Sequence, residues 1–183
     1  MTNSNSPRTT LVLGGARSGK SRFAEDLATR SGLRKIYLAT GAAHDDEMAD
    51  RIQAHRQQRG DNWTTIEEQF DIAGVLQAEC REETVVLVDC LTLWLSNLMF
   101  ADKDLAQETA ALCEALVTLH GPAIFVSNEV GMGIVPENRL SRSFRDAQGR
   151  LNQDIARVAG KVVFVAAGLP LLMKPTTQSE ITL

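Results

Sequence analysis

A complete phosphate-binding motif lies near the amino terminus: Gly14-Gly15-Ala16-Arg17-Ser18-Gly19-Lys20-Ser21. It matches GxxxxGK[ST], follows the apolar run 11–13 and opens a helical segment, which is the setting that this motif requires. Glycines let the backbone curl so that successive N–H groups point at phosphate oxygens, and the helix N-terminus adds positive partial charge. The motif predicts that Lys20 bridges the terminal phosphates and that the Ser21 hydroxyl binds Mg²⁺. A glycine-rich turn that only caps a helix is the alternative.

On either side of this motif, short β-rich runs alternate with helical periods. Several runs are continuous in Val, Ile, Leu and Phe, which suits strands covered on both faces. This pattern predicts an α/β fold, a three-layer P-loop NTPase (RecA-like) domain with a mainly parallel sheet. The expected strands are 10–13, 35–40, 63–67, 84–89, 123–128 and 161–167, with an antiparallel edge strand at 169–173. The expected helices are 20–30, 45–59, 72–80, 91–100, 105–120 and 138–158.

Composition excludes several classes of protein. The chain has 183 residues, 44% of them hydrophobic and 23% charged, which argues against a disordered or collagen-like chain. Its formal net charge of −4 argues against a general nucleic-acid binder. Three cysteines without a CxxC pair are typical of a reduced, cytoplasmic protein. No export signal is expected, because residues 1–10 are polar. No membrane span is expected either, because the most apolar stretch, 162–173, is too short and contains Gly168 and Pro170.

The chain is expected to form one nucleotide-binding domain over residues 1–183, with flexible tails at 1–8 and 175–183. No internal repeat or interior linker divides it.

A second acidic residue of the kind that P-loop proteins place near their metal ends an apolar run. Residues 85–89 read Val-Val-Leu-Val-Asp, which is typical of a Walker B strand. Asp89 would then hold Mg²⁺ directly or through water. The alternative is that Asp89 is the N-cap of the helix that starts at Leu91, and both roles are compatible.

A histidine lies in a cationic row that a simple kinase does not need. Segment 45–59 carries acids in its first turn and bases in its last, which favours a helix. Arg51, His55 and Arg59 stand four residues apart and so form one row, which suits a triphosphate lying alongside. The arginines favour the neutral imidazole, a competent nucleophile toward phosphorus. The alternative is a solvated helix face.

Three blocks together resemble the bifunctional adenosylcobinamide kinase/adenosylcobinamide-phosphate guanylyltransferase family of cobalamin biosynthesis. They are residues 14–21, residues 45–56 with Asp45-Asp46-Glu47-Met48 and Arg51-Ile52-Gln53-Ala54-His55-Arg56, and residues 127–140, Ser-Asn-Glu-Val-Gly-Met-Gly-Ile-Val-Pro-Glu-Asn-Arg-Leu. The resemblance covers residues 10–174. It implies that ATP or GTP phosphorylates the aminopropanol hydroxyl of adenosylcobinamide. GTP then guanylylates an enzyme histidine with loss of pyrophosphate, and adenosylcobinamide phosphate accepts the GMP to give adenosyl-GDP-cobinamide.

The resemblance also implies a set of site residues. His55 corresponds to the guanylylated histidine and is expected to be catalytic together with Lys20, and Ser21 and Asp89 are expected to hold Mg²⁺. Some relatives have a second histidine at Ala54, and some have glutamate at Asp89. A homo-oligomer is expected, with a trimer as the expected form. The nucleotide is expected to contact Gly14, Gly15, Ala16, Arg17, Ser18, Gly19, Lys20, Ser21, Ala39, Thr40, Gly41, Arg56, Gln57, Gln58, Arg59, Glu67 and Asp89.

Segment 128–139 starts at the carboxyl end of an expected strand, where open α/β sheets bind ligands. Ile134 and Val135 could touch an apolar corrinoid face, and Arg139, Arg142 and Arg145 then line a helix. The segment is interpreted as part of the corrinoid site or as a subunit interface. A helix-entry loop with a solvated arginine face is the alternative.

Two other functions compete with the bifunctional enzyme. A simple P-loop small-molecule kinase would transfer phosphoryl groups without forming a covalent nucleotidyl enzyme. A nucleotide-dependent regulatory switch is disfavoured because the chain lacks an Asn-Lys-x-Asp segment for reading guanine.

Overall fold

The computed structural model describes residues 8–41 and 62–175. Every expected strand is present, and so is every expected helix outside 45–59, a segment that lies outside the described residues. The elements are β1 (Thr9–Gly14), α1 (Lys20–Arg30), β2 (Arg34–Ala39), β3 (Trp63–Glu67), α3 (Ile72–Glu79), β4 (Thr84–Asp89), α4 (Leu91–Phe100), α5 (Leu105–Val117), β5 (Ala123–Asn128), α6 (Arg139–Val158), β6 (Lys161–Ala166) and β7 (Leu169–Lys174).

The strands form one seven-stranded sheet in the order β3-β2-β4-β5-β1-β6-β7. All neighbouring strands are parallel except β6 and β7, which pair antiparallel, so the expected edge strand is confirmed. Strand β1, which leads into the phosphate-binding motif, lies inside the sheet between β5 and β6. The predicted α/β fold with a mainly parallel sheet is therefore confirmed.

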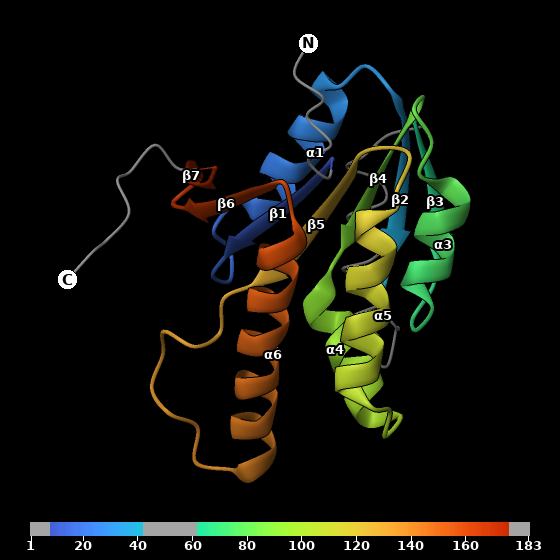
Figure 1. Cartoon of the computed structure of the whole chain (residues 1–183). Helices are drawn as coiled ribbons and strands as arrows, with labels where there is room; N and C mark the ends of the chain where they lie inside the picture. Colours follow the sequence, from blue (N-terminus) through green and yellow to red (C-terminus); the bar gives the residue numbers. More distant parts are fainter. Residues whose placement is uncertain (1–7, 42–61, 176–183) are drawn as a thin grey trace, which may run out of the picture.

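Helices cover both faces of this sheet, with α1 on one face and α3, α4, α5 and α6 on the other (Figure 1). Every residue of β1 is buried, as are all but the last residues of β4 and β5. Successive residues alternate between two cores, because neighbouring side chains of a strand point to opposite faces. Val12 packs with Ala24 and Ala28 of α1, whereas Leu11 belongs to the larger cluster beneath the other helices.

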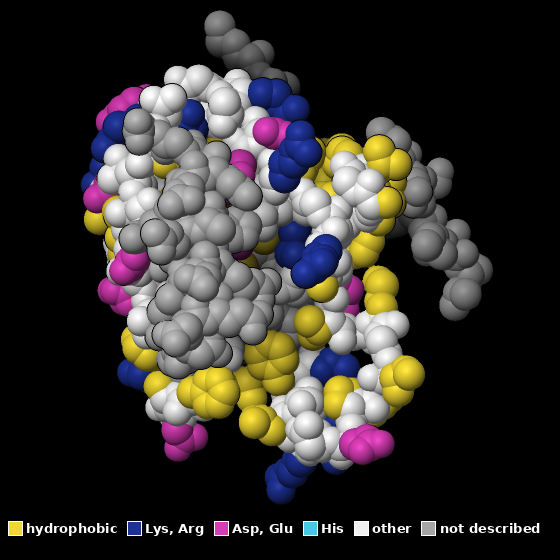
Figure 2. Space-filling model, turned by 180° about the vertical axis from the view of Figure 1, so that it is seen from behind, with side chains coloured by type: hydrophobic (Ala, Val, Ile, Leu, Met, Phe, Trp, Pro, Cys, Tyr) yellow, Lys and Arg dark blue, Asp and Glu magenta, His cyan; other side chains and the backbone are white. Residues whose placement is uncertain are grey.

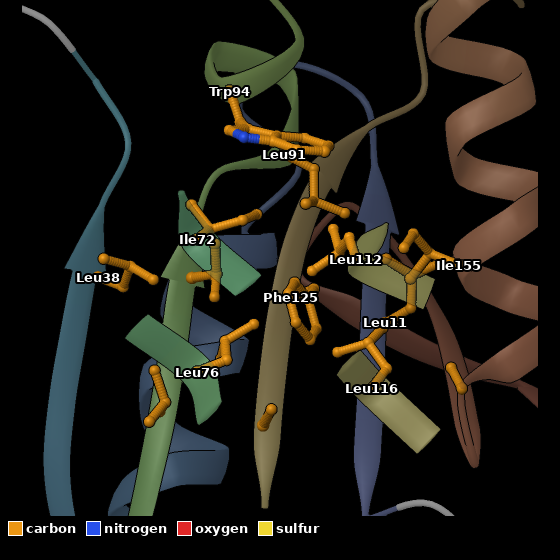
Figure 3. Close-up of a cluster of buried hydrophobic side chains, with 14 of the residues drawn as sticks. Leu11, Leu38, Ile72, Leu76, Leu91, Trp94, Leu112, Leu116, Phe125 and Ile155 are labelled. Atoms are coloured by element: carbon orange, nitrogen blue, oxygen red, sulfur yellow. The ribbon is translucent and has the colours of Figure 1, made fainter. Parts of the chain in front are cut away.

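Figure 3 shows that larger cluster, in which Leu112, Leu116 and Ile155 of α5 and α6 meet Phe125 and Leu11 of the sheet. This continuous burial explains why the central strands are apolar at every position. It also fixes the sheet rigidly, so the loops at its carboxyl edge start from well-defined points.

The helix expected at 105–120 is shorter in the structure and ends at Val117. The Thr118 N–H and the Thr118 hydroxyl both donate to Ala115 O, which closes the last turn. The other element boundaries differ from expectation by one residue or less. Within the ranges 8–41 and 62–175, no helix has the length and apolar character needed to cross a membrane.

Candidate nucleotide site

The phosphate-binding motif lies where the sequence predicts it, between the end of β1 at Gly14 and the start of α1 at Lys20. Arg17 and Gly19 adopt positive φ angles of 56° and 92°, so the loop curls back on itself before the helix begins. Ser18 N–H donates to Gly15 O at 3.3 Å, and Phe23 N–H donates to Gly19 O at 3.0 Å as the first bond of α1. The backbone therefore forms the strand–loop–helix cradle of a P-loop.

Lys20 and Ser18 give this cradle its polar side chains. The Lys20 ammonium donates to Gly15 O at 3.2 Å, so it reaches back across the loop. The Ser18 hydroxyl is buried and has no hydrogen-bond partner among the described residues. Gly14 has no room for a side chain, because a Cβ there would come within 2.5 Å of both Ser18 Oγ and Val165 O.

The turn between β6 and β7 supports the loop, a contact that our sequence analysis missed. Gly168 N–H donates to Ser18 O at 2.8 Å, and a Cβ on Gly19 would come within 3.1 Å of Gly168 Cα. Ala167 and Gly168 have φ angles of 51° and 78°, as in the two-residue turns that join antiparallel strands. The Ala-Gly pair between two apolar runs was the available sequence signal, but it does not reveal where the turn packs.

Three of the predicted nucleotide contacts lie level at the carboxyl edge of the sheet. Ala39 at the end of β2 pairs with Glu67 of β3 on one side and with Asp89 of β4 on the other. Gly41 follows two residues beyond Ala39. The parallel strands bring this row and the phosphate-binding loop to the same edge, which is where ligands of open α/β sheets bind.

The Thr40 side chain is buried and forms its hydrogen bonds inside the protein. It is fully buried, and its hydroxyl donates to Cys90 O at 2.7 Å and accepts from Cys90 N–H at 2.9 Å. Asn97 of α4 donates to Thr40 O at 2.7 Å and to Gln69 O at 3.3 Å. These bonds join the ends of β2, β3 and β4 to α4, so Thr40 positions the edge from within. Its predicted contact with nucleotide stays a prediction.

The N-cap of helix α4, which follows β4, is not the residue that the sequence analysis considered. Cys90, not Asp89, is the N-cap residue of α4, so the N-cap role considered for Asp89 is wrong. Burial raises the pKa of the Cys90 thiol to about 12; the Asp89 carboxylate acts in the same direction and the Lys20 ammonium in the opposite one. The end of β4 and the start of α1 lie at the same edge of the sheet, because β4, β5 and β1 are parallel neighbours.

A buried polar cluster fixes β5 against α6 next to this site, and it also was not predicted. The Ser127 hydroxyl donates to Asn152 Oδ1 at 2.6 Å, and Gln148 Nε2 donates to both of these oxygens at 3.0 Å. Asn152 Nδ2 in turn donates to Asn128 O at 3.1 Å. Gln148 and Asn152 are polar residues one turn apart on an otherwise apolar stripe of α6, which was the only sequence signal.

Two backbone N–H groups at the end of β5, those of Asn128 and Glu129, bind neighbouring parts of the site. Asn128 N–H donates to the Thr92 hydroxyl of α4 at 2.9 Å, and Glu129 N–H donates to Gly14 O at 3.0 Å. Segment 129–138 therefore starts in direct contact with the phosphate-binding loop.

The structure does not describe the predicted site residues of segment 55–59. His55, Arg56, Gln57, Gln58 and Arg59 lie outside the described residues. Among the residues that are described, no group of three or more His, Cys, Asp or Glu side chains is placed to hold a metal ion.

Comparison with known proteins shows the family to which this chain belongs. The sequence pattern described as "Cobinamide kinase / cobinamide phosphate guanyltransferase" matches residues 10–173. The chain belongs to this family. It is therefore a bifunctional enzyme of adenosylcobalamin biosynthesis, with a kinase and a guanylyltransferase activity. The family resemblance inferred from the three sequence blocks is confirmed.

Relatives of the cobinamide kinase / guanyltransferase family match over nearly their whole length. The bifunctional adenosylcobalamin biosynthesis protein CobP of Pseudomonas aeruginosa is 49% identical over 90% of this chain and 96% of that protein. CobU of Escherichia coli is 41% identical over 90% of this chain and 98% of its own. Among solved structures, an ATPase of a bacterial type III secretion system shares the fold, with a TM-score of 0.53 and 10% identity over 90% of this chain and 56% of that one. A Pyrococcus horikoshii protein has a TM-score of 0.54 and 12% identity, over 91% and 85% of the two chains.

Proposed function

We propose that this member of the family phosphorylates adenosylcobinamide with ATP or GTP and then transfers GMP from GTP to the product through a guanylyl-His55 intermediate. Adenosyl-GDP-cobinamide and pyrophosphate are the final products. The observation that carries the proposal is the P-loop cradle of residues 14–21, which lies at the carboxyl edge of the sheet together with the strand ends at Ala39 and Asp89.

In the kinase step, the hydroxyl oxygen of the aminopropanol arm attacks the γ-phosphorus. The bond from that phosphorus to the β,γ-bridging oxygen breaks, the hydroxyl proton is released, and a nucleoside diphosphate leaves. The backbone N–H groups of loop 14–21 and the Lys20 ammonium stabilise the charge on the phosphate oxygens.

In the transfer step, an imidazole nitrogen of His55 attacks the α-phosphorus of GTP and the bond to the α,β-bridging oxygen breaks, so pyrophosphate leaves. A phosphate oxygen of adenosylcobinamide phosphate then attacks the same phosphorus and breaks the P–N bond, which restores His55. The P-loop holds the leaving phosphates in this step as it holds the nucleotide in the first. Ala39, Thr40, Gly41, Glu67 and residues 56–59 belong to the proposed nucleotide site.

The donor groups at the cradle fit Mg²⁺. Ser21 at the start of α1 and Asp89 at the end of β4 offer two oxygen ligands, and Mg²⁺ in nucleotide sites usually takes one or two protein oxygens beside phosphates and water. When bound, the ion would neutralise charge on the phosphates.

The proposal also includes a cytoplasmic homo-oligomer, with a trimer as the expected form. Strand β7 supports this part, because Leu169, Leu171 and Leu172 at the sheet edge are 73%, 64% and 54% exposed. An apolar edge strand of this kind tends to associate unless something covers it. Sedimentation velocity tests the point, and a single species of monomer mass contradicts it.

Intact-protein mass spectrometry after incubation with GTP and Mg²⁺ tests the covalent step. The wild-type chain is expected to gain the mass of one GMP in an acid-labile bond, and His55→Ala is expected to gain none. The exposed His120 provides the matched control, because His120→Ala should still form the adduct. GTP binding without an adduct would favour the simple kinase, and an adduct on His55→Ala would place the nucleophile elsewhere.

A further inference from the structure

An apolar groove of about 330 Å³ lies between the end of α4 and the start of α6. Its lining contains no charged side chain and consists of Ser96, Met99, Phe100, Leu140, Ser141 and Phe144. Both helices project beyond the carboxyl edge of the sheet (Figure 1), so the groove opens on the same side as the phosphate-binding loop.

Exposed apolar side chains lie on the walls of the groove and in the segment that leads into α6. Phe100 and Leu140 on its walls are 76% and 60% exposed, and Met132, Ile134 and Val135 in the neighbouring segment 129–138 are 79%, 97% and 60% exposed. Figure 2 shows hydrophobic side chains at the lower end of the molecule, where α4 ends and α6 begins in Figure 1. Apolar side chains gathered at the mouth of a groove usually mark a binding site.

The groove is joined to the nucleotide site along two routes. Helix α4 begins directly after Asp89 and Cys90, and its ten residues place Phe100 about 13 Å farther along the helix axis. Segment 129–138 begins at the bond from Glu129 N–H to Gly14 O and ends on α6, where Arg142 donates to Pro136 O at 3.0 Å and to Glu137 O. The groove is therefore connected through α4 to the end of β4 and through segment 129–138 to the phosphate-binding loop.

We propose that this groove binds the corrin ring of cobinamide and so holds the acceptor for both reactions. The assignment rests on the proposed function and extends it to the second substrate. A corrin ring presents methyl-covered apolar faces and uncharged amide arms, which match an apolar groove with two serine hydroxyls at hand. The aminopropanol arm then runs beside α4 toward Asp89.

The charges around the groove argue against a nucleotide as its occupant. A phosphate would require cations, yet the lining holds none. On α6, Arg142 is bonded to the backbone of segment 129–138, Arg145 is paired with Asp146 at 3.1 Å, and the exposed Arg139 does not line the groove. An uncharged macrocycle needs no such partner. The uncharged lining therefore favours the corrin ring over a nucleotide as the occupant of the groove.

Equilibrium dialysis, with cobinamide followed by its own visible absorbance, tests the assignment. Phe100→Ser and Leu140→Ser each remove an exposed apolar wall and are expected to weaken cobinamide binding about tenfold while GTP affinity stays the same. Val117→Ser is the matched control, because Val117 is 62% exposed at the end of α5 and does not line the groove; it should bind cobinamide like the wild type.

Three results would overturn the assignment. Wild-type affinity in both groove variants would exclude the groove while leaving the proposed function intact. Weaker binding together with a changed sedimentation mass would identify the groove as a contact between copies of the chain. A wild-type chain that binds no cobinamide would overturn the proposed function, and the groove assignment with it.

Discussion

Gly14 is surrounded so closely that the phosphate-binding loop depends on its missing side chain. Gly14→Ala would put a methyl group within 2.5 Å of Ser18 Oγ and Val165 O, and the backbone oxygen cannot easily move. We expect this variant to lose about 1–3 kcal/mol of unfolding free energy, as over-packed sites do, and to bind GTP more weakly. Urea denaturation and GTP titration measure the two effects.

The neighbouring glycine provides the control for this prediction. A Cβ on Gly15 would have no atom within 4 Å, so Gly15→Ala should change the unfolding free energy by less than about 1 kcal/mol. Equal stability losses in the two variants would contradict the steric explanation.

Which residues form the cradle could be predicted, because the motif places all of its members within eight consecutive positions. The role of Thr40 could not, since its partner Cys90 lies far along the chain and nothing local marks the pair. Hydrogen bonds between distant segments depend on strand order, which the sequence pattern alone does not determine.

Buried polar side chains, those of Ser127, Gln148 and Asn152, join helix α6 to β5 beside the apolar contacts of the core. Asn152→Leu would remove the bonds that its amide makes with Ser127, Gln148 and Asn128 O, and would leave only the Gln148–Ser127 bond in this buried cluster. We expect a loss of about 2–4 kcal/mol of unfolding free energy. Chemical denaturation measures it.

Gln153 is the matched control on the same helix, because its side chain is exposed. Gln153→Leu should change stability by less than about 0.5 kcal/mol. If Asn152→Leu behaved like Gln153→Leu, the polar cluster would contribute nothing to the joint between these two elements.

Most elements were predictable because each central strand is buried on both faces and so reads as an unbroken apolar run. An edge strand was also predicted, at 169–173, from the turn that Gly168 allows, and the structure has it at Leu169–Lys174. The end of α5 was not, because the closing bonds of Thr118 compete with a helical pattern that continues to residue 120.

Two buried thiols make the stability of the whole molecule depend on alkaline pH. Burial raises the pKa values of Cys80 and Cys90 to about 12 in the folded state, from an ordinary value of 9.0. Between these values the unfolded chain releases thiol protons that the folded chain retains, so rising pH favours unfolding. Stability is full below about pH 9 and should fall by up to about 1.4 kcal/mol per pH unit for each thiol above it.

Urea denaturation from pH 8 to 10.5 measures this dependence. Cys80→Ala removes one titrating thiol, so its stability should fall less steeply with pH than that of the wild type. Parallel curves for the two proteins would contradict the role given to Cys80.

The site at the scale of the molecule was only partly predictable. Motif, acidic strand end and family blocks predicted a nucleotide site at the carboxyl edge of the sheet. The groove between α4 and α6 was not predicted, because it brings together residues 96–100 and 140–144, which no local pattern connects.

The position of β1 inside the sheet has a consequence for the order in which the protein can be made. Its partners β5 and β6 come late in the chain, with Thr9 paired to Ala123 and Thr10 to Lys161, and the turn that supports Ser18 comes later still. During synthesis, the phosphate-binding residues therefore leave the ribosome before the strands β5 and β6 and the turn that hold them in place. A nascent chain that ends before β6 has the motif but no finished cradle, so the phosphate-binding loop gains its full support only after β6 and the turn at 167–168 have been made.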